Sequence, residues 1–156
     1  MIEVTIPGYK TVRLQHLVMD YNGTMACDGR LIEGVREMLD ALRDRLEIHV
    51  LTADTFGKAR AELAGVPASL SVLPEADQDQ GKLDYVRALG LASVVAIGNG
   101  RNDKLMLAAA ELGIALIQEE GACVETVTAA DMVCPSILSA LTLLTQTGRL
   151  VAGLRR

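Results

Sequence analysis

The chain has 156 residues, a net charge of −5 and 50% apolar residues, so one core can be filled and no basic surface for nucleic acid is indicated. Aromatic residues make up only 3%, which favours buried parallel strands covered by aliphatic helices. Three widely spaced cysteines without a CxxC pair predict free thiols in a reducing compartment. No leader or membrane-length apolar run is visible. We therefore expect a soluble cytoplasmic protein with a single domain over residues 1–156.

Strands and helices alternate along the apolar pattern. Strands are predicted at residues 2–6, 12–19, 47–52, 69–73, 93–98, 113–117 and 131–134. Helices are predicted at residues 31–46, 55–65, 78–90, 102–112, 121–130 and 135–146. Pro135 is expected at the first position of the last helix. This alternation predicts an α/β fold, a three-layer, doubly wound parallel sheet with helices on both faces.

Ligands bind outside the carboxyl ends of the strands in such sheets, so the loops after the strands are of most interest. Three of them are short, polar and rich in Gly, Asn, Asp and Thr: residues 20–24, 52–55 and 98–103. They contain one carboxylate after a strand, Asp20, two hydroxyls, and an amide and carboxylate cluster. The one cation that the set needs is predicted to be Lys82, at the start of a helix, with Lys58 as a rival.

This combination suits phosphoryl transfer. A carboxylate nucleophile can form an aspartyl-phosphate, and the reaction needs little beyond positioning and neutralisation of charge. Oxygen ligands from carboxylates and amides are those that Mg²⁺ prefers. The sequence therefore predicts a Mg²⁺-dependent site for a small phosphorylated substrate or phosphoryl donor.

The chain resembles the haloacid dehalogenase (HAD)-like phosphohydrolases, and among them the small soluble relatives of the P-type ATPase phosphorylation domain. Four motifs of that family occur in order: DYNGT at residues 20–24, Thr52 after an apolar strand, Lys82 at a helix start, and GNGRND at residues 98–103. The resemblance covers roughly residues 12 to 134. It implies a Rossmann-type fold, and neither gap between the motifs has room for a cap domain.

The resemblance also implies a role for each matching residue. Asp20 is the nucleophile and a metal ligand, and the backbone carbonyl of Asn22 is a second ligand. The catalytic set is Asp20, Asn22, Thr52 and Lys82. The phosphate-binding set is Gly23, Thr24, Thr52, Ala53, Lys82 and Asn102. The metal set is Asp20, Asn22, Asn99 and Asp103, with the last two bound directly or through water.

Two positions depart from the family pattern. Phosphatases of the family carry an acid/base Asp where this chain has Asn22, and an amide does not titrate in the relevant range. Asn99 replaces a ligand Asp and contributes no charge. We therefore expect slow turnover on Asp20; the alternative is a binding or regulatory module that kept the fold but lost catalysis.

The remaining candidate residues receive simpler interpretations. His16 and His49 are expected to be strand residues without a catalytic role. Cys27 lies near the site but has no nearby base, so it is not a nucleophile candidate. The missing cap, together with the high apolar fraction, favours a homo-oligomer such as a tetramer, in which a neighbouring subunit covers the open site.

Overall fold

A computed structural model describes residues 1–54 and 57–156. Its centre is a six-stranded, wholly parallel sheet in the order β10-β9-β8-β3-β6-β7. The strands are β3 His16–Asp20, β6 Glu47–Thr52, β7 Ser69–Val72, β8 Val94–Gly98, β9 Leu112–Leu116 and β10 Met132–Cys134. Every strand of this sheet had been predicted, so the α/β class and the parallel sheet are confirmed.

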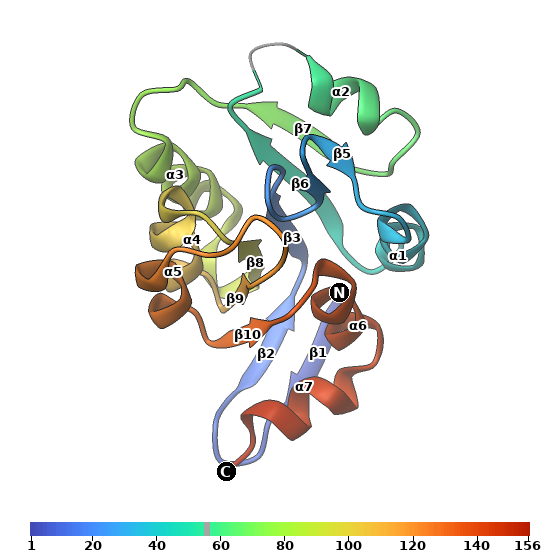
Figure 1. Cartoon of the computed structure of the whole chain (residues 1–156). Helices are drawn as coiled ribbons and strands as arrows, with labels where there is room; N and C mark the ends of the chain where they lie inside the picture. The colour runs from blue at the N-terminus through green and yellow to red at the C-terminus, as the bar shows by residue number, and fades with distance from the viewer. Residues whose placement is uncertain (55–56) are drawn as a thin grey trace.

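Helices cover both faces of the sheet (Figure 1). The helices are α1 Val35–Leu42, α2 Lys58–Glu62, α3 Gln78–Leu89, α4 Lys104–Ala109, α5 Val124–Ala129, α6 Ile137–Thr145 and α7 Thr147–Leu154, with short 3-10 helices at Leu91–Ser93 and Arg101–Asp103. Side chains of β3 alternate between two apolar clusters: Leu17 and Met19 pack with α1 and α6, and Val18 packs with α3 and α4. The three predicted layers follow from this alternation.

The strand predicted at residues 12–19 is broken at Gln15, which corrects the sequence-based expectation. Residues up to Leu14 form β2 (Thr11–Leu14), which pairs antiparallel with β1 (Ile2–Thr5) outside the central sheet. The backbone of Gln15 donates to Ser93 O (2.8 Å) and accepts from Glu47 N (2.8 Å). Its hydrogen bonds therefore already belong to the central sheet, and the chain changes partners at that residue.

The helix predicted at residues 31–46 is shorter than expected. Leu31 lies in β5 (Arg30–Leu31), which pairs antiparallel with β4 (Ala26–Cys27) to form a small flap after β3. Helix α1 begins only after Gly34, whose φ of 89° is left-handed and cannot continue a helix. A residue pattern with helical spacing is therefore divided between a flap strand and a helix.

In the C-terminal region one expectation is wrong and one helix was not predicted. The side chain of Ser136 accepts from Ser139 N (3.0 Å) and caps α6, so Pro135 lies before the helix rather than at its first position. A separate helix, α7, follows α6 and contacts β1, which was not predicted. Of the predicted helix at residues 55–65, only Lys58–Glu62 form a helix, α2, and residues 63–65 form a turn. Residues 55 and 56 lie outside the described part.

The described residues, 1–54 and 57–156, include no single helix that is long and apolar enough to cross a membrane. Helices α6 and α7 reach that composition only as a pair bent by 103°. Most of the apolar side chains of α6 are buried in the core of the domain. The segment between β3 and β6, residues 21–46, consists of the β4–β5 flap and α1, so no cap domain is inserted there.

Candidate active site

Three charged side chains from distant parts of the sequence meet at the carboxyl edge of the sheet. Lys82 Nζ, from α3, donates to Asp20 Oδ1 at the end of β3 and to Asp103 Oδ1 after β8, both at 2.6 Å. The Lys82 and Asp103 side chains are fully buried, and that of Asp20 is 12% exposed. The structure therefore brings together the predicted nucleophile, the predicted cation and one predicted metal-site carboxylate.

The loop after β8 folds around Asp103. Its Oδ2 accepts from Asn99 N and Gly100 N, each at 2.9 Å. Gly98 allows this close approach, because a Cβ there would lie 2.5 Å from the Asp103 Cγ atom. Both carboxylate oxygens of Asp103 are thus already occupied, one by two backbone amides and one by Lys82.

The turn after β3 places Thr24 between the two predicted metal-site groups. Its buried hydroxyl lies 3.4 Å from Asp20 Oδ2 and 3.3 Å from Asn99 Oδ1, within donor reach of both. Gly23 has a φ of 76°, and a Cβ at this residue would lie 2.4 Å from Asn99 Nδ2. The glycine is therefore required both by the backbone conformation and by the neighbouring amide.

The other predicted residues lie around this centre. Thr52 is buried at the end of β6, and its hydroxyl accepts from Asp54 N (3.1 Å). Asn102 Oδ1 accepts from Lys82 Nζ (3.3 Å). Ala53 is half-buried just after Thr52, and the Asn22 side chain is exposed on the turn. The amide of Asn22 cannot act as a general acid or base near neutral pH.

The buried charges are not balanced. Burial raises the pKa of Asp20 to about 7, the charge of Asp103 adds to this rise, and the Lys82 ammonium opposes it. Burial would lower the pKa of Lys82, but the charges of Asp103 and Asp20 outweigh that effect and raise it. Two carboxylates therefore share one ammonium, and a cation would relieve the excess negative charge.

The donor set fits a hard divalent cation such as Mg²⁺. It contains only oxygen ligands: the Asp20 carboxylate, the Asn99 amide oxygen and the backbone carbonyl of Asn22. Since both oxygens of Asp103 are engaged, that residue fits better as a ligand through water. Because positions 22 and 99 carry amides, such a site would hold the cation with less negative charge than if both were aspartates.

A functional residue that sequence reasoning missed is Gln118, in the loop after β9. Its Nε2 donates to Gly23 O (2.9 Å) and Thr24 O (2.8 Å), and its Oε1 accepts from Ile137 N (2.8 Å). It connects the turn after β3 to the start of α6. The signal was present, because this loop also follows a strand and ends at the same edge of the sheet.

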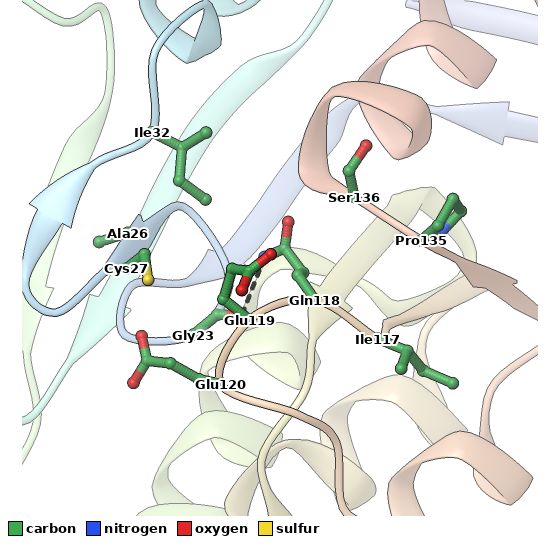
Figure 2. A pocket seen from close by; sticks show the side chains of 10 residues that line it. All are labelled: Gly23, Ala26, Cys27, Ile32, Ile117, Gln118, Glu119, Glu120, Pro135 and Ser136. Carbon is green, nitrogen blue, oxygen red and sulfur yellow. Dashed lines mark hydrogen bonds between the residues drawn. The ribbon is translucent and has the colours of Figure 1, made fainter.

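Beside the turn after β3 lies a pocket of about 500 Å³, a size suited to a small ligand (Figure 2). Its walls come from the turn, the flap, the loop after β9 and the start of α6: Gly23, Ala26, Cys27, Ile32, Ile117, Gln118, Glu119, Glu120, Pro135 and Ser136. Figure 2 shows Glu120 near Gly23 and Cys27, so carboxylates border part of the pocket.

The rival residues lie elsewhere. Lys58 Nζ donates to Asp28 O in the flap (3.2 Å) rather than to Asp20. His16 and His49 are strand residues, as predicted, and their freedom from a catalytic role stays a prediction. Burial and then the charge of Asp28 raise the pKa of the Cys27 thiol, which agrees with an unreactive cysteine.

No family model matches the sequence. An uncharacterized protein of Methanocaldococcus jannaschii is 47% identical over 62 residues, which cover 40% of this chain and 67% of that protein, so the two belong to one family. The cobalt-bound deoxy-D-mannose-octulosonate 8-phosphate phosphatase of Haemophilus influenzae superposes with a TM-score of 0.71 at 15% identity, over 86% of this chain and 88% of that one. The 3-deoxy-D-manno-octulosonate 8-phosphate phosphatase of Moraxella catarrhalis, in complex with a magnesium ion, a phosphate ion and a KDO molecule, superposes with a TM-score of 0.68 at 16% identity, over 89% of this chain and 92% of that one.

Proposed function

Because the chain has the HAD-like hydrolase fold, we propose that it is a metal-dependent phosphohydrolase acting on a small phosphorylated substrate. The observation that carries the proposal is the buried cluster of Asp20, Lys82 and Asp103 at the carboxyl edge of the sheet. The expected cation is Mg²⁺, which is supported by the oxygen-only donor set and by the magnesium in the Moraxella catarrhalis phosphatase structure. We expect residues 1–156 to act as one domain.

The chemistry follows from what each side chain can reach. An oxygen of Asp20 attacks phosphorus, the bond from phosphorus to the ester oxygen breaks, and the leaving oxygen takes a proton from solvent. The ammonium of Lys82 and the hydroxyls of Thr24 and Thr52 bind the transferring oxygens. Water then hydrolyses the aspartyl-phosphate, which returns Asp20 and releases inorganic phosphate. A bound Mg²⁺ would supply positive charge that keeps Asp20 ionised and neutralises the phosphoryl group.

Asn22 should decide which substrates react. Its amide cannot protonate a leaving alkoxide or activate water, so general acid/base catalysis is missing at both steps. Phosphates with acidic leaving groups, such as p-nitrophenyl phosphate and acetyl phosphate, need no such proton. We therefore expect them to be cleaved faster than alkyl phosphates, whose leaving groups are poor.

The test is hydrolysis of a panel of p-nitrophenyl phosphate, acetyl phosphate, ATP and an alkyl phosphate with Mg²⁺. Asp20→Asn should abolish release of phosphate from each. Asn22→Asp should raise the rate by roughly 10²–10⁴-fold, the range typical of acid/base groups, and most strongly for the alkyl phosphate. An Asp44→Asn variant, altered at an exposed carboxylate (93% exposed), is the matched control and should behave as wild type.

The alternative function is a binding or regulatory module, which is favoured by the amides at positions 22 and 99. It predicts that wild type and Asp20→Asn are equally inactive across the panel and that Asn22→Asp changes nothing. In that case phosphate should still bind, because the anion-binding groups remain. The hydrolase proposal would then be wrong.

We also propose that the protein forms a homo-oligomer, of which a tetramer is one form. The pocket beside Gly23 is partly open to solvent, so a neighbouring subunit could cover it. Light scattering at micromolar concentration should give a mass above that of the 16.6 kDa monomer. A monomer at that concentration would contradict this expectation.

A further inference from the structure

A second cluster of polar side chains lies at the opposite, amino-terminal edge of the sheet. His16 begins β3, Glu47 begins β6 directly beside it, and His49 lies two residues further along β6. His16 is four residues before Asp20 on the same strand, or about 13 Å at the rise of a β-strand. This cluster is thus separate from the proposed phosphohydrolase site, and nothing in that chemistry uses it.

The three donor atoms form a small triangle. His16 Nδ1 lies 3.2 Å from His49 Nε2 and 3.4 Å from Glu47 Oε2, and His49 Nε2 lies 4.0 Å from Glu47 Oε2. The point equidistant from the three atoms lies about 2.1 Å from each, which matches the ~2.0–2.2 Å bonds of zinc to histidine nitrogen and carboxylate oxygen. In the described residues 1–54 and 57–156, no other group of three such ligand atoms lies this close together.

The surroundings of His49 suit a metal ligand. Its side chain is 9% exposed, and its Nδ1 lies 3.0 Å from the hydroxyl of Tyr85 on α3. The Ser71 hydroxyl donates to the same Tyr85 oxygen (3.4 Å). When Nδ1–H donates to Tyr85, the lone pair of Nε2 points to the triangle; such outer partners orient metal-binding histidines.

We propose that His16, Glu47 and His49 bind a divalent transition-metal ion, such as Zn²⁺, with water at the fourth position. Two imidazoles and one carboxylate favour Zn²⁺, Co²⁺ or Ni²⁺ over Mg²⁺, which prefers oxygen ligands. Glu47 is 75% exposed, so the ion and a water ligand can enter from solvent. Through Tyr85 the ion ties the starts of β3 and β6 to α3, the helix that carries Lys82.

The test measures binding of Zn²⁺ by calorimetry, with excess Mg²⁺ present to occupy the predicted Mg²⁺ site. Wild type should bind one Zn²⁺ per chain with micromolar or tighter affinity, and Asp20→Asn should bind it equally well. His16→Ala and His49→Ala should weaken binding by more than about 100-fold, and Tyr85→Phe by about 10–100-fold, the range for lost outer partners. The control variant Asp44→Asn should not change the affinity.

Glu47→Gln keeps the test decisive even if a histidine variant fails to fold, because this side chain is exposed. It should weaken Zn²⁺ binding at least about tenfold, since an amide oxygen is a poorer ligand than a carboxylate. Co²⁺ should give the visible absorption of a tetrahedral site without a thiolate band. Absent Zn²⁺ binding, an unchanged affinity in Glu47→Gln, or a Co²⁺–thiolate band from the cysteines would overturn the proposal. Because Asp20 is not involved, these outcomes are independent of the hydrolase proposal.

Discussion

Replacing Asp20 by Asn should stabilise the metal-free protein at neutral and alkaline pH while abolishing hydrolysis. In the folded protein, burial and Asp103 raise the pKa of Asp20 to about 7, against an ordinary value of 3.8. The folded state therefore prefers the protonated carboxyl. The stability that this preference contributes is complete below about pH 4 and is lost as the pH rises through about 7. Asn cannot ionise, so the variant avoids that loss.

The size of the effect follows from the shift. One pKa unit corresponds to about 1.4 kcal/mol, and the rise of about three units sets an upper limit of about 4 kcal/mol. Part of this stabilisation has already been lost at pH 5. The contribution of Asp20 to the free energy of unfolding therefore falls by about 3 kcal/mol between pH 5 and pH 8. The Asp20 side chain is only 12% exposed, so solvent screens little of this effect. Removal of one carboxylate leaves Lys82 and Asp103 as a balanced pair.

The assay is urea unfolding followed by far-ultraviolet circular dichroism at pH 5 and pH 8 in the presence of a chelator. We expect the free energy of unfolding of Asp20→Asn, relative to that of wild type, to rise by about 3 kcal/mol between pH 5 and pH 8. Asp44→Asn should show no such gain. Added Mg²⁺ should stabilise wild type at pH 8 more than the variant. An equal effect of Asp20→Asn at both pH values would refute the view that burial and Asp103 disfavour the ionised form of this carboxyl.

Three further substitutions test other parts of the site. Lys82→Met should destabilise the protein by about 3–5 kcal/mol in chemical unfolding, because it leaves two buried carboxylates without a cation, whereas Lys58→Met should leave stability and hydrolysis unchanged. Gly23→Ala should lower the free energy of unfolding by more than about 1 kcal/mol and should also lower the rate of hydrolysis. The left-handed φ of Gly23 disfavours a side chain, and a Cβ there would clash with the Asn99 amide. Gln118→Ala should lower the melting temperature by the equivalent of about 1–3 kcal/mol, because two backbone carbonyls of the turn after β3 lose their donor. A wild-type melting curve for any of the destabilising variants would contradict the corresponding contact.

The residues of the candidate site could be placed from the sequence because of one topological rule. The carboxyl ends of parallel strands share one edge, so Asp20, Thr52 and Asp103 had to be neighbours once their strands were recognised. Lys82 was harder, because a lysine at a helix start is usually solvated. Its burial between two carboxylates depends on the position of α3 over β3 and β8, which no local pattern contains.

Element boundaries were least predictable where local and long-range preferences differ. Residues 31–46 have helical apolar spacing, yet Leu31 pairs with Ala26 in the flap, because strand pairing and the left-handed Gly34 override helical propensity. Gln15 sits in an apolar run that reads as one strand. The strand is nevertheless interrupted at Gln15, because the backbone of this residue forms hydrogen bonds with Ser93 and Glu47, which lie far away in the sequence.

The order of strands and helices, the edge where chemistry occurs and the residue types there all follow from local patterns in this sequence, because apolar spacing and turn residues act over a few positions. Strand register and burial follow from contacts between distant segments and became visible only in the folded chain. Register places Glu47 opposite His16 and so makes a metal-binding triangle from residues that are individually unremarkable in the sequence. Burial raises the pKa of Asp20, because the charge of a carboxylate depends on how much water the assembled layers exclude.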